Sequence, residues 1–560
     1  MSNTPFSRLA DLAEKLEHTT KRREIADLLS GFLGGLSTTE IPPAVRLTIG
    51  QVFPEWDRRV LNVSWKALMA VVDELVDVPS RLRDQASEQA ADGGQFIFLL
   101  LDRARRQPPS PPALTITDVF HSFEEIAATS GRGSRARKEA LLRGLFERAS
   151  SLEAKHLSKI IYGEMRHGVS EGLMMDGIAK AAGVNARQVR RANQFWGDLG
   201  EVALVALTQG EPGLKTATVR PFQPLKPMLA QTAEDLTEAF ERFHGRVALE
   251  YKLDGARVQL HRVDEQVRIY SRNLSDVTAS LPDVVAQIKH STFAPECILE
   301  GEAVAVDAQG RPLPFQHLMR RFRRKYDIDA AVREIPVQLH LFDALYMNGD
   351  SLVDMPYRDR WSALEQASGG LNLVRRIIPK TTEEAQAFAE TSHRDGHEGV
   401  MAKDLSSTYT PGVRGKSWLK LKHIMSLDLV IVAADWGYGR RHGWLSNYHL
   451  AALDGDTGEF LVIGKTYKGL RDVEFQAMTE RLLSLERSRQ QSTVFVRPHL
   501  VVEVLFNEIQ ASNQYKSGLA LRFARITRLR DDKTPSQADS IRTVRQLYEK
   551  QFSYKGQPVS

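Results

Sequence analysis

The sequence predicts a multidomain protein with an all-α domain, an α+β domain and a C-terminal β-barrel. Three patterns predict this division. Apolar residues recur three and four positions apart up to about residue 210, alternation with period two dominates afterwards, and short strands with glycine-rich turns follow residue 424. We expect the boundaries 1–210, 228–424 and 425–560, with a linker over 211–227. A chain of 560 residues is long enough for three separate cores.

The first domain is expected to be helical. Residues 9–16 and 137–152 show the clearest helical spacing of apolar side chains. Four prolines within 107–112 predict a loop between two groups of helices. A second break, 208–227, contains four prolines and two glycines without clear periodicity, so it predicts the linker.

The other two domains are expected to contain the strands. In the α+β domain the strand-like segments are 246–253, 258–262, 267–271, 297–306, 337–347 and 418–421, and the helical ones include 274–289 and 382–392. In the last domain the strand-like segments are 427–434, 448–453, 459–467 and 500–510. Short strands at this spacing are typical of a small antiparallel barrel of the oligonucleotide-binding (OB) type.

Composition excludes several classes of protein. A hydrophobic content of 42% and a charged content of 26% are typical of soluble globular proteins. No apolar run is long enough to span a membrane, and the polar residues 1–4 do not resemble a secretory signal, so we expect no membrane partner. Cys297 is the single cysteine, which excludes intramolecular disulfides and multi-cysteine zinc sites and fits a reducing cytoplasm.

The segment 250–257, Glu-Tyr-Lys-Leu-Asp-Gly-Ala-Arg, carries the strongest chemical signal. Alternating apolar residues on both sides predict a turn between two strands. Lys252 at such a turn can act as a nucleophile, and Arg257 can hold a phosphate. The pattern Lys-x-Asp-Gly is weak by itself, because chance supplies it in about one chain of this length in ten.

Further motifs supply what a lysine needs to attack a nucleotide phosphate. They are Ser-Arg-Asn at 271–273, Glu300 and Glu302 on one strand face, Glu398 and Lys403 within 398–403, and Trp418, Lys420 and Lys422 on one face of a later strand. Carboxylates of this kind suit Mg²⁺ bound together with substrate phosphates. Each motif alone more often marks a solvated surface, but their order and coincidence favour a nucleotide site.

Positive charge is concentrated at two places, although the net charge is only +5 with a pI near 9.0. The first cluster is Arg320, Arg321, Arg323, Arg324 and Lys325, and the second is Arg522, Arg525, Arg528 and Arg530. A single cluster is as often a solvated face as a binding surface. Two clusters that flank a site of phosphate chemistry favour a polyanionic partner such as nucleic acid.

Taken in order, these motifs resemble those of the ATP-dependent DNA ligases. The matching segments are 252–257, 271–273, 300–305, 398–403, 418–422 and a final block over 521–533 that ends in Arg-x-Asp-Lys; 315–321 and 341–343 match as well. One departure is Ala524, where many relatives carry proline. The helical first third is similar to the DNA-binding domain of the larger ligases, and 163–170 resembles the turn that docks on the minor groove. The resemblance therefore covers nearly the whole chain.

The resemblance implies a role for each matching residue. Lys252 becomes covalently adenylated, Glu250 reads the adenine amino group and Phe342 stacks on the base. The implied cofactor-binding residues are Glu250, Arg257, Arg272, Glu302, Phe342, Arg414, Lys420, Lys422, Arg525, Arg530, Asp532 and Lys533. The implied magnesium ligands are Glu302 and Glu398, and the implied DNA-binding residues are Arg166, Gly168, Ser170, Arg320, Arg321 and Arg323.

The implied activity is the sealing of nicks in duplex DNA through a lysyl-AMP intermediate. The implied cofactors are ATP and Mg²⁺, with Mn²⁺ as a substitute. We expect a monomer that encloses nicked double-stranded DNA, in the cytoplasm and with the nucleoid of a prokaryote; the sequence identifies no recruiting protein. Neighbouring cations and a metal are expected to lower the pKa of Lys252, and a hinge is expected near 426–428.

Several alternatives share the Lys-x-Asp-Gly core. NAD-dependent ligases resemble chains with a four-cysteine zinc module, which one cysteine cannot form. The helical first domain and the final block argue against GTP-using capping enzymes and RNA ligases. A non-catalytic DNA-binding clamp and a ligase that acts on RNA-containing nicks stay open, although the presence of Lys252, Glu302 and Glu398 favours the enzyme.

Overall fold

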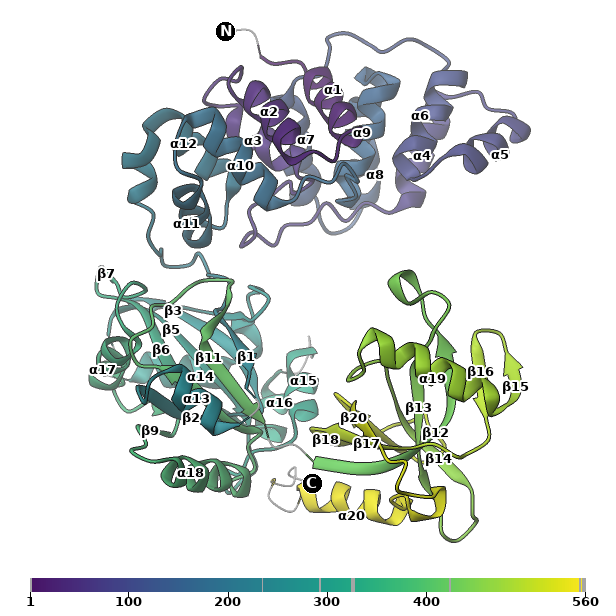
Figure 1. Ribbon diagram of the computed structural model, residues 1–560. Helices are drawn as coiled ribbons and strands as arrows, with labels where there is room; N and C mark the ends of the chain where they lie inside the picture. The colour runs from purple at the N-terminus through teal and green to yellow at the C-terminus, as the bar shows by residue number, and fades with distance from the viewer. Residues whose placement is uncertain are drawn as a thin grey trace.

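Figure 1 shows a helical part at the N-terminal end, a central part with helices around two sheets, and a C-terminal part built on an antiparallel sheet. The computed structural model describes residues 3–233, 235–291, 294–323, 328–422, 425–552 and 555. None of the helices in these ranges is both long and apolar enough to cross a membrane. The predicted succession of all-α, α+β and β parts is confirmed.

Side-chain caps mark the start of seven of the described helices of the first part. The helices are α1 (Phe6–Glu17), α2 (Arg22–Leu33), α3 (Ile41–Thr48), α4 (Trp65–Leu75), α5 (Ser80–Gln89), α6 (Gly93–Ala104), α7 (Ile116–Ala128), α8 (Ser134–Arg148), α9 (Ser151–Tyr162), α10 (Glu171–Ala182), α11 (Ala186–Trp196) and α12 (Leu199–Lys215). The seven capped helices are α4, α6, α7, α9, α10, α11 and α12. The predicted run 137–152 is divided between two helices, because the side chains of Ser150 and Glu153 form a capping box. Helix α12 continues past a non-helical Gly210 to Lys215, so residues 211–215 of the expected linker are helical.

The central part contains two sheets and the helices that cover them. Its elements are β1 (Leu229–Thr232), α13 (Leu236–Arg242), β2 (Val247–Lys252), β3 (Ala256–Val263), β4 (Gln266–Ser271), α14 (Pro282–His290), β5 (Glu296–Ala305), α15 (Phe315–Arg323), α16 (Ile328–Glu334), β6 (Val337–Met347), β7 (Asp350–Ser351), α17 (Tyr357–Ala367), β8 (Asn372–Leu373), β9 (Arg376–Ile377), α18 (Thr382–Arg394), β10 (Gly399–Asp404) and β11 (Arg414–Lys422). One sheet has the order β1-β11-β10-β2-β9, and the other has β4-β3-β5-β6-β7 with β8 beside β6. The predicted helix 274–289 starts only at Pro282, a residue suited to the first turn of a helix.

The described C-terminal part has a seven-stranded antiparallel sheet, a separate two-stranded sheet and two α-helices. Its elements are β12 (Met425–Trp436), β13 (Leu445–Leu453), β14 (Phe460–Thr466), α19 (Asp472–Ser484), β15 (Glu486–Gln490), β16 (Thr493–Val496), β17 (Val501–Phe506), β18 (Glu508–Ala511), β19 (Leu519–Arg522), β20 (Arg525–Leu529) and α20 (Ile541–Phe552). The separate two-stranded sheet consists of β18 and β19. The predicted strand 500–510 is divided into β17 and β18. The expected hinge near 426–428 falls at the start of β12, and the preceding 423–424 lie outside the described residues.

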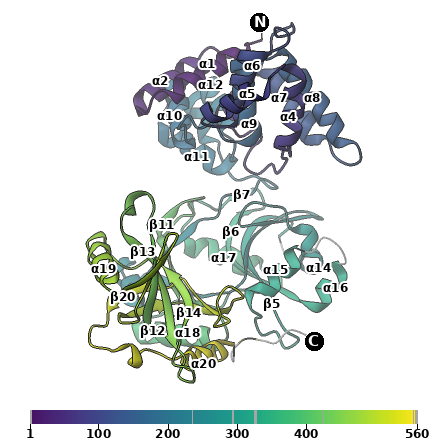
Figure 2. The same ribbon diagram turned by 90° about the vertical axis from the view of Figure 1, so that its right-hand side faces the viewer.

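Polar contacts join the three parts. Arg191 pairs with Asp354 of the central part at 2.5 Å, and Lys226 pairs with Glu55. In Figures 1 and 2 the helical part lies across one end of the central part, with α11 nearest to it. From the C-terminal end, Lys555 reaches the central part.

Candidate active site

A cavity of about 1030 Å³ lies at the ends of β2, β10 and β11, and residues of the C-terminal part form a section of its wall. The predicted residues that line it are Glu250, Lys252, Arg257, Arg272, Glu302, Phe342, Glu398, Arg414, Lys420 and Lys422. The fold therefore gathers at one cavity side chains from segments that stretch from residue 250 to residue 422.

Lys252 ends β2, and its amine contacts a carboxylate at the start of β10. Its Nζ lies 2.5 Å from Oε2 of Glu398, and the Nζ of Lys422 lies 2.7 Å from the same oxygen. The strand register brings both lysines to Glu398, because the next residue, Gly399, pairs with Lys252 on one side and with Lys422 on the other. Gly399 has φ +138°, and an added Cβ would lie 2.2 Å from the carbonyl oxygen of Leu421, so glycine is required.

The carboxylates around Lys252 raise its pKa. Burial by itself lowers this pKa, but Glu398, Glu302 and Asp254 together outweigh burial. The neighbouring cationic side chains by themselves therefore do not lower the pKa of Lys252, contrary to that part of the expectation. The physical reason is distance, since the nearest charge to the amine is the carboxylate of Glu398.

Glu302 and Glu398 have opposite pKa shifts, although both line the cavity. Burial raises the pKa of Glu302 to about 7, and Lys252 offsets this only in part. Burial also acts to raise the pKa of Glu398, but Lys252 and Lys422 outweigh it and lower the pKa to about 2. Within the described ranges the Glu302 side chain forms no hydrogen bond or ion pair, so its oxygens are available to a cation.

Another section of the cavity wall is aromatic and contains a buried ion pair. Glu250 and Lys403 are 2% and 1% exposed, and Oε2 of Glu250 lies 2.7 Å from Nζ of Lys403. The Tyr357 hydroxyl donates to the other Glu250 oxygen. The ammonium of Lys403 lies 4.3 Å from the ring centre of Trp418 and 4.6 Å from that of Phe342. The sequence motif includes Lys403 but does not show its partner, because the contact with Glu250 arises only when β10 pairs with β2.

Arg257 lines this wall, but its guanidinium already has partners. Nη2 donates to Glu300 at 2.6 Å, and Nη1 donates to the carbonyl of Met228 at 2.6 Å. The group lies 5.4 Å from the ring centres of both Phe342 and Trp418. Its buried Nε has no hydrogen-bond partner among the described residues. A phosphate contact by Arg257 can therefore use Nε or the second N–H of Nη1 while the bonds to Glu300 and Met228 are kept.

Arg272, Arg414 and Lys420 add positive charge to the cavity. Arg272 and Arg414 are exposed at its edge. Burial lowers the pKa of Lys420, and the charges of Lys422, Arg414 and Lys252 lower it further. Such a concentration of cations is suited to a polyphosphate.

The predicted residues of the C-terminal block lie outside the cavity. Arg530 and Lys533 pair with Asp428 at 2.8 and 2.5 Å, and Arg530 also pairs with Asp532 at 2.6 Å. Arg525 is exposed on β20. In this conformation, therefore, the structure does not bring Arg525, Arg530, Asp532 and Lys533 to the other cofactor-binding residues.

Other residues of the C-terminal part line the cavity instead, among them Arg522, Phe523 and Lys555. Arg522 and Phe523 belong to the matched block 521–533, and Arg522 also belongs to the predicted positive cluster, whereas Lys555 carries no sequence signal. Phe523 has φ +59° and is 55% exposed, and the Nζ of Lys555 lies 2.6 Å from Oδ2 of Asp254. Only the packing of the C-terminal part against the central part brings these side chains to the site.

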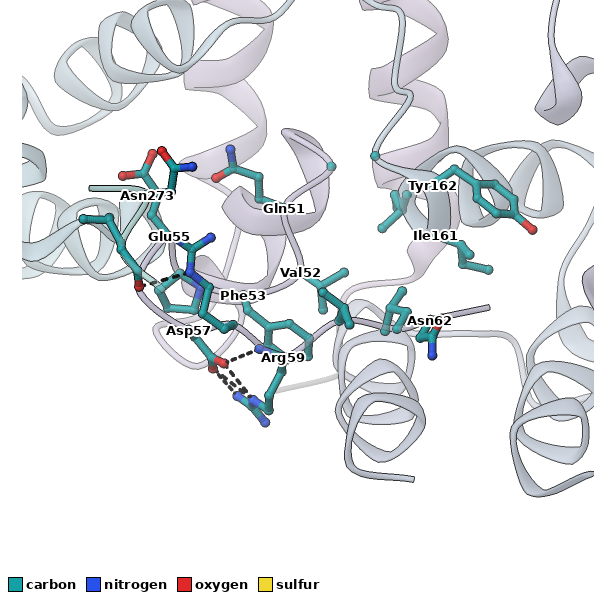
Figure 3. A pocket seen from close by; sticks show the side chains of 18 of the residues that line it. Gln51, Val52, Phe53, Glu55, Asp57, Arg59, Asn62, Ile161, Tyr162 and Asn273 are labelled. Carbon is teal, nitrogen blue, oxygen red and sulfur yellow. Dashed lines mark hydrogen bonds and ion pairs between the residues drawn. The ribbon is translucent and has the colours of Figure 1, made fainter. Parts of the chain in front are cut away.

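Figure 3 shows a second pocket, of about 680 Å³, between the helical and central parts. Its walls are the loop 50–62, the end of α9 and the turn Arg272–Leu274, and the ion pair of Asp57 with Arg59 lies at its edge. Arg272 lines this pocket as well as the larger cavity. The helical part therefore adjoins the cavity at Arg272.

The predicted DNA-binding turn connects α9 and α10. Arg166 and Gly168 have φ +53° and +73°, and the Arg166 guanidinium is half-exposed while it donates to the carbonyl of Ala91 at 3.2 Å. The Ser170 hydroxyl caps α10 by accepting the N–H of Leu173 at 3.3 Å. Ser170 therefore already has a role in the helix end.

The structure contradicts the predicted DNA contact of Arg321. This side chain is 1% exposed, pairs with Asp283 and donates to the carbonyl of Ser280 at 3.1 Å. Successive residues of a helix point in different directions, so the neighbouring Arg320 is exposed while Arg321 faces the core. Arg323 belongs to α15, but its side chain lies outside the described part of the structure.

Sequence comparison identifies the family. The family model for the DNA ligase N terminus matches residues 5–179, the ATP dependent DNA ligase domain matches 227–422, and the ATP dependent DNA ligase C terminal region matches 441–533. The chain belongs to the ATP-dependent DNA ligases. Its central part is the nucleotidyltransferase domain of that family.

Relatives of similar length agree with this membership. DNA ligase 1 of Korarchaeum cryptofilum (strain OPF8) is 45% identical over 97% of this chain and 98% of its own length. The DNA ligase of Thermococcus onnurineus (strain NA1) is 40% identical over 99% and 100%. The solved structure Pmar-Lig_PreS3 shares the fold with a TM-score of 0.50 at 16% identity, over 93% of this chain and 99% of that one. This ligase is therefore an enzyme that uses ATP and forms phosphodiester bonds in DNA.

Proposed function

We propose that Lys252 of this ligase attacks the α-phosphorus of ATP, expels pyrophosphate and forms a lysyl-AMP phosphoramidate. The observation that carries the proposal is the position of the Lys252 amine in a cavity shared with carboxylates and further cations. The neutral amine is the nucleophile, so Lys252 must lose a proton first. The ion pair with Glu398 opposes that loss as long as the carboxylate faces the amine.

The wall around Glu250 supports its assignment to the adenine base. Glu250 lines the cavity, and each of its oxygens keeps acceptor capacity beyond the contacts with Tyr357 and Lys403. This capacity suits the adenine amino group, and the ring of Phe342 suits stacking on the base. We assign the phosphates to Arg257, Arg272, Arg414, Lys420 and Lys422.

Glu302 and Glu398 fit a Mg²⁺ ion, with Mn²⁺ as a substitute. The fit rests on the donor set, since both offer carboxylate oxygens to one cavity and Glu302 forms no ion pair within the described residues. When bound, the ion would supply charge stabilisation at the α-phosphate. Engagement of Glu398 in such a site would also separate this carboxylate from Lys252.

The same residues serve the two later steps on a nicked duplex. An oxygen of the 5′ phosphate attacks the adenylyl phosphorus and frees Lys252. The 3′ hydroxyl then attacks the 5′ phosphorus, loses its proton and expels AMP. In all three steps a nucleophile attacks a phosphorus atom and displaces a leaving group. One set of cations can therefore stabilise the negative charge of each transition state.

We further propose that the helical part and the edge of the cavity hold the duplex. Arg166, Gly168 and Ser170 would face the minor groove, and the exposed Arg320 would contact the backbone. Arg525, Arg530, Asp532 and Lys533 would act on pyrophosphate only after the C-terminal part has turned. We propose that the ligase is a monomer and that it is located with the nucleoid. We further propose that its domains comprise residues 1–210, 228–424 and 425–560.

The adenylation step is tested by incubating the enzyme with ATP labelled at the α-phosphate. Lys252→Ala should acquire no covalent label, because the amine that forms the phosphoramidate is missing. The control is Lys516→Ala, which removes an exposed lysine paired with Glu459 and should label like the parent enzyme. Labelling of the Lys252 variant would contradict the assignment of the nucleophile.

The complete reaction is tested on a labelled nicked duplex with Mg²⁺ and with ATP, NAD or no nucleotide. Sealing with ATP alone is expected, with enzyme kept below substrate so that preadenylated protein cannot account for it. The same duplex with RNA on one side of the nick distinguishes an RNA-directed ligase. Absence of sealing on every substrate would indicate a DNA clamp.

A further inference from the structure

Lys403 has an unusual environment for an ammonium group. It is 1% exposed, and its Nζ lies 4.3, 4.6 and 4.7 Å from the ring centres of Trp418, Phe342 and Tyr357. It also donates to the carbonyl oxygen of Phe342 at 3.2 Å. Its only carboxylate partner among the described residues is Glu250, at 2.7 Å.

A buried ion pair of this kind needs a reason other than stability. Removing two charges from water costs several kcal/mol per ion, and an apolar pair of similar size is often equally stable. Glu250 and Lys403 both line the cavity, so the pair lies where a ligand contacts it. Its position indicates a role in recognition.

We infer that Lys403 is a positioning residue that sets the choice of adenine over guanine by holding Glu250 in its ionised form. The inference rests on the proposed function, in which Glu250 faces the base. An ionised carboxylate only accepts hydrogen bonds. It therefore favours the amino group at C6 of adenine and repels the carbonyl oxygen that guanine carries there. A protonated Glu250 would donate to that carbonyl instead.

The surroundings of Glu250 show that its ionisation depends mainly on Lys403. Burial raises the pKa of Glu250, and Lys403 is the largest influence that lowers it, ahead of Arg376. The Tyr357 hydroxyl donates to the same carboxylate but carries no charge. Without Lys403, the remaining groups oppose protonation of the buried carboxyl less strongly.

The test compares covalent labelling of the full chain by ATP and by GTP, each labelled at the α-phosphate. Lys403→Met keeps the length of the side chain and removes its charge. The ratio of kcat/KM for ATP to that for GTP should fall by about tenfold or more. The fall should come mainly from a higher KM for ATP, because the contact with the amino group exists before and during the reaction.

Two further variants complete the test. Lys403→Arg keeps the positive charge and should retain most of the preference for ATP. Glu250→Gln presents a neutral amide that can donate as well as accept, so it should lose the preference as Lys403→Met does, and the double variant should lose no more.

The outcomes separate this inference from the proposed function. If Lys403→Met lowers labelling by both nucleotides in parallel and leaves their ratio unchanged, Lys403 is merely structural and the inference is overturned. If Lys403→Met does not fold, an unchanged ratio in Glu250→Gln overturns it equally. If the parent enzyme takes no label from ATP, the proposed function fails before the ratio can be measured.

Discussion

At the residue scale, burial decides what a charged side chain does in this ligase. Arg360 and Asp343 are both fully buried and pair at 2.8 Å, so they belong to the core of the central domain. Arg321 is buried in a similar way, while its neighbour Arg320 is exposed. A cluster of arginines in the sequence therefore contains residues that hold the fold as well as residues that face solvent.

The pair Arg320 and Arg321 tests this distinction. Arg321→Ala should lower the free energy of unfolding by about 3 kcal/mol, because Asp283 loses its partner beside the core. It should leave the salt dependence of DNA binding unchanged. Arg320→Ala should leave the free energy of unfolding unchanged. It should reduce the slope of log affinity for DNA against log salt concentration by about one. Denaturant unfolding and DNA titrations at several salt concentrations measure both, and a reduced slope for Arg321→Ala alone would contradict the assignment.

At the element scale, strand register places the reacting groups. β10 lies between β2 and β11, so Gly399 pairs with Lys252 on one side and Lys422 on the other, and Glu398 contacts both lysines. The spacing of motifs in the sequence does not show this register. It follows from the hydrogen-bond ladders of the sheet.

Gly399→Ala should disturb this register at its tightest point. The new Cβ would lie 2.2 Å from the carbonyl oxygen of Leu421, so β10 and β11 must separate there. Because Glu398 is a proposed metal ligand, its displacement from the other cavity residues should slow enzyme adenylation about 100-fold. The control is Gly415→Ala on β11, where no described atom lies within 4 Å of the new Cβ. Equal rates in the two variants, measured by labelling with ATP, would refute the role of the register.

His261 on β3 anchors the segment that follows α12. Its Nδ1 accepts the N–H of Phe222 at 2.9 Å, and its Nε2 lies 2.9 Å from Gln259, which also accepts the N–H of Leu225. Burial lowers the pKa of His261 to about 3. The folded protein therefore keeps this imidazole neutral at pH values where the unfolded chain protonates it.

This shift predicts a loss of stability in acid. The folded pKa lies below the unfolded value of about 6.5, so the contribution of His261 is complete above about pH 6.5 and falls as the pH decreases toward 3. Between pH 8 and pH 5, the advantage of the parent enzyme over His261→Gln in free energy of unfolding should shrink by about 2 kcal/mol. Urea unfolding at both pH values measures it, and a constant difference would show that His261 titrates normally.

At the scale of the whole molecule, the position of the C-terminal part determines which residues reach the cavity. Arg522, Phe523 and Lys555 line it here, whereas Arg530 and Lys533 are held by Asp428. Under the proposed function, the C-terminal part turns before the predicted residues of its final block reach ATP. The ion pair of Lys555 with Asp254 must open in that turn.

DNA binding by the assembled domains should depend steeply on salt. The proposed contacts lie on the helical part and at the cavity edge, and most of them involve phosphates rather than bases. With about six to ten such contacts, the affinity for a nicked duplex should fall about 10³- to 10⁵-fold between 50 and 200 mM salt. It should hardly depend on base sequence. A shallow salt dependence, measured by fluorescence anisotropy, would count against enclosure of the duplex.

The sequence by itself determined the succession of all-α, α+β and β parts and most of the cavity residues. It could do so because alternation and motifs are local properties of the chain, and 337–347 was predicted with the bounds of β6. It joined 137–152 into one helical run and started the helix of 274–289 too early, because a capping serine and an N-terminal proline set those helix boundaries.

The tertiary structure alone decided which distant side chains meet. It buried Arg321, paired Lys403 with Glu250, and brought Lys555 rather than Lys533 to the central domain. These outcomes depend on strand register and on the packing of one domain against another. Both arise from contacts between segments far apart in the chain, which no local pattern of residues encodes.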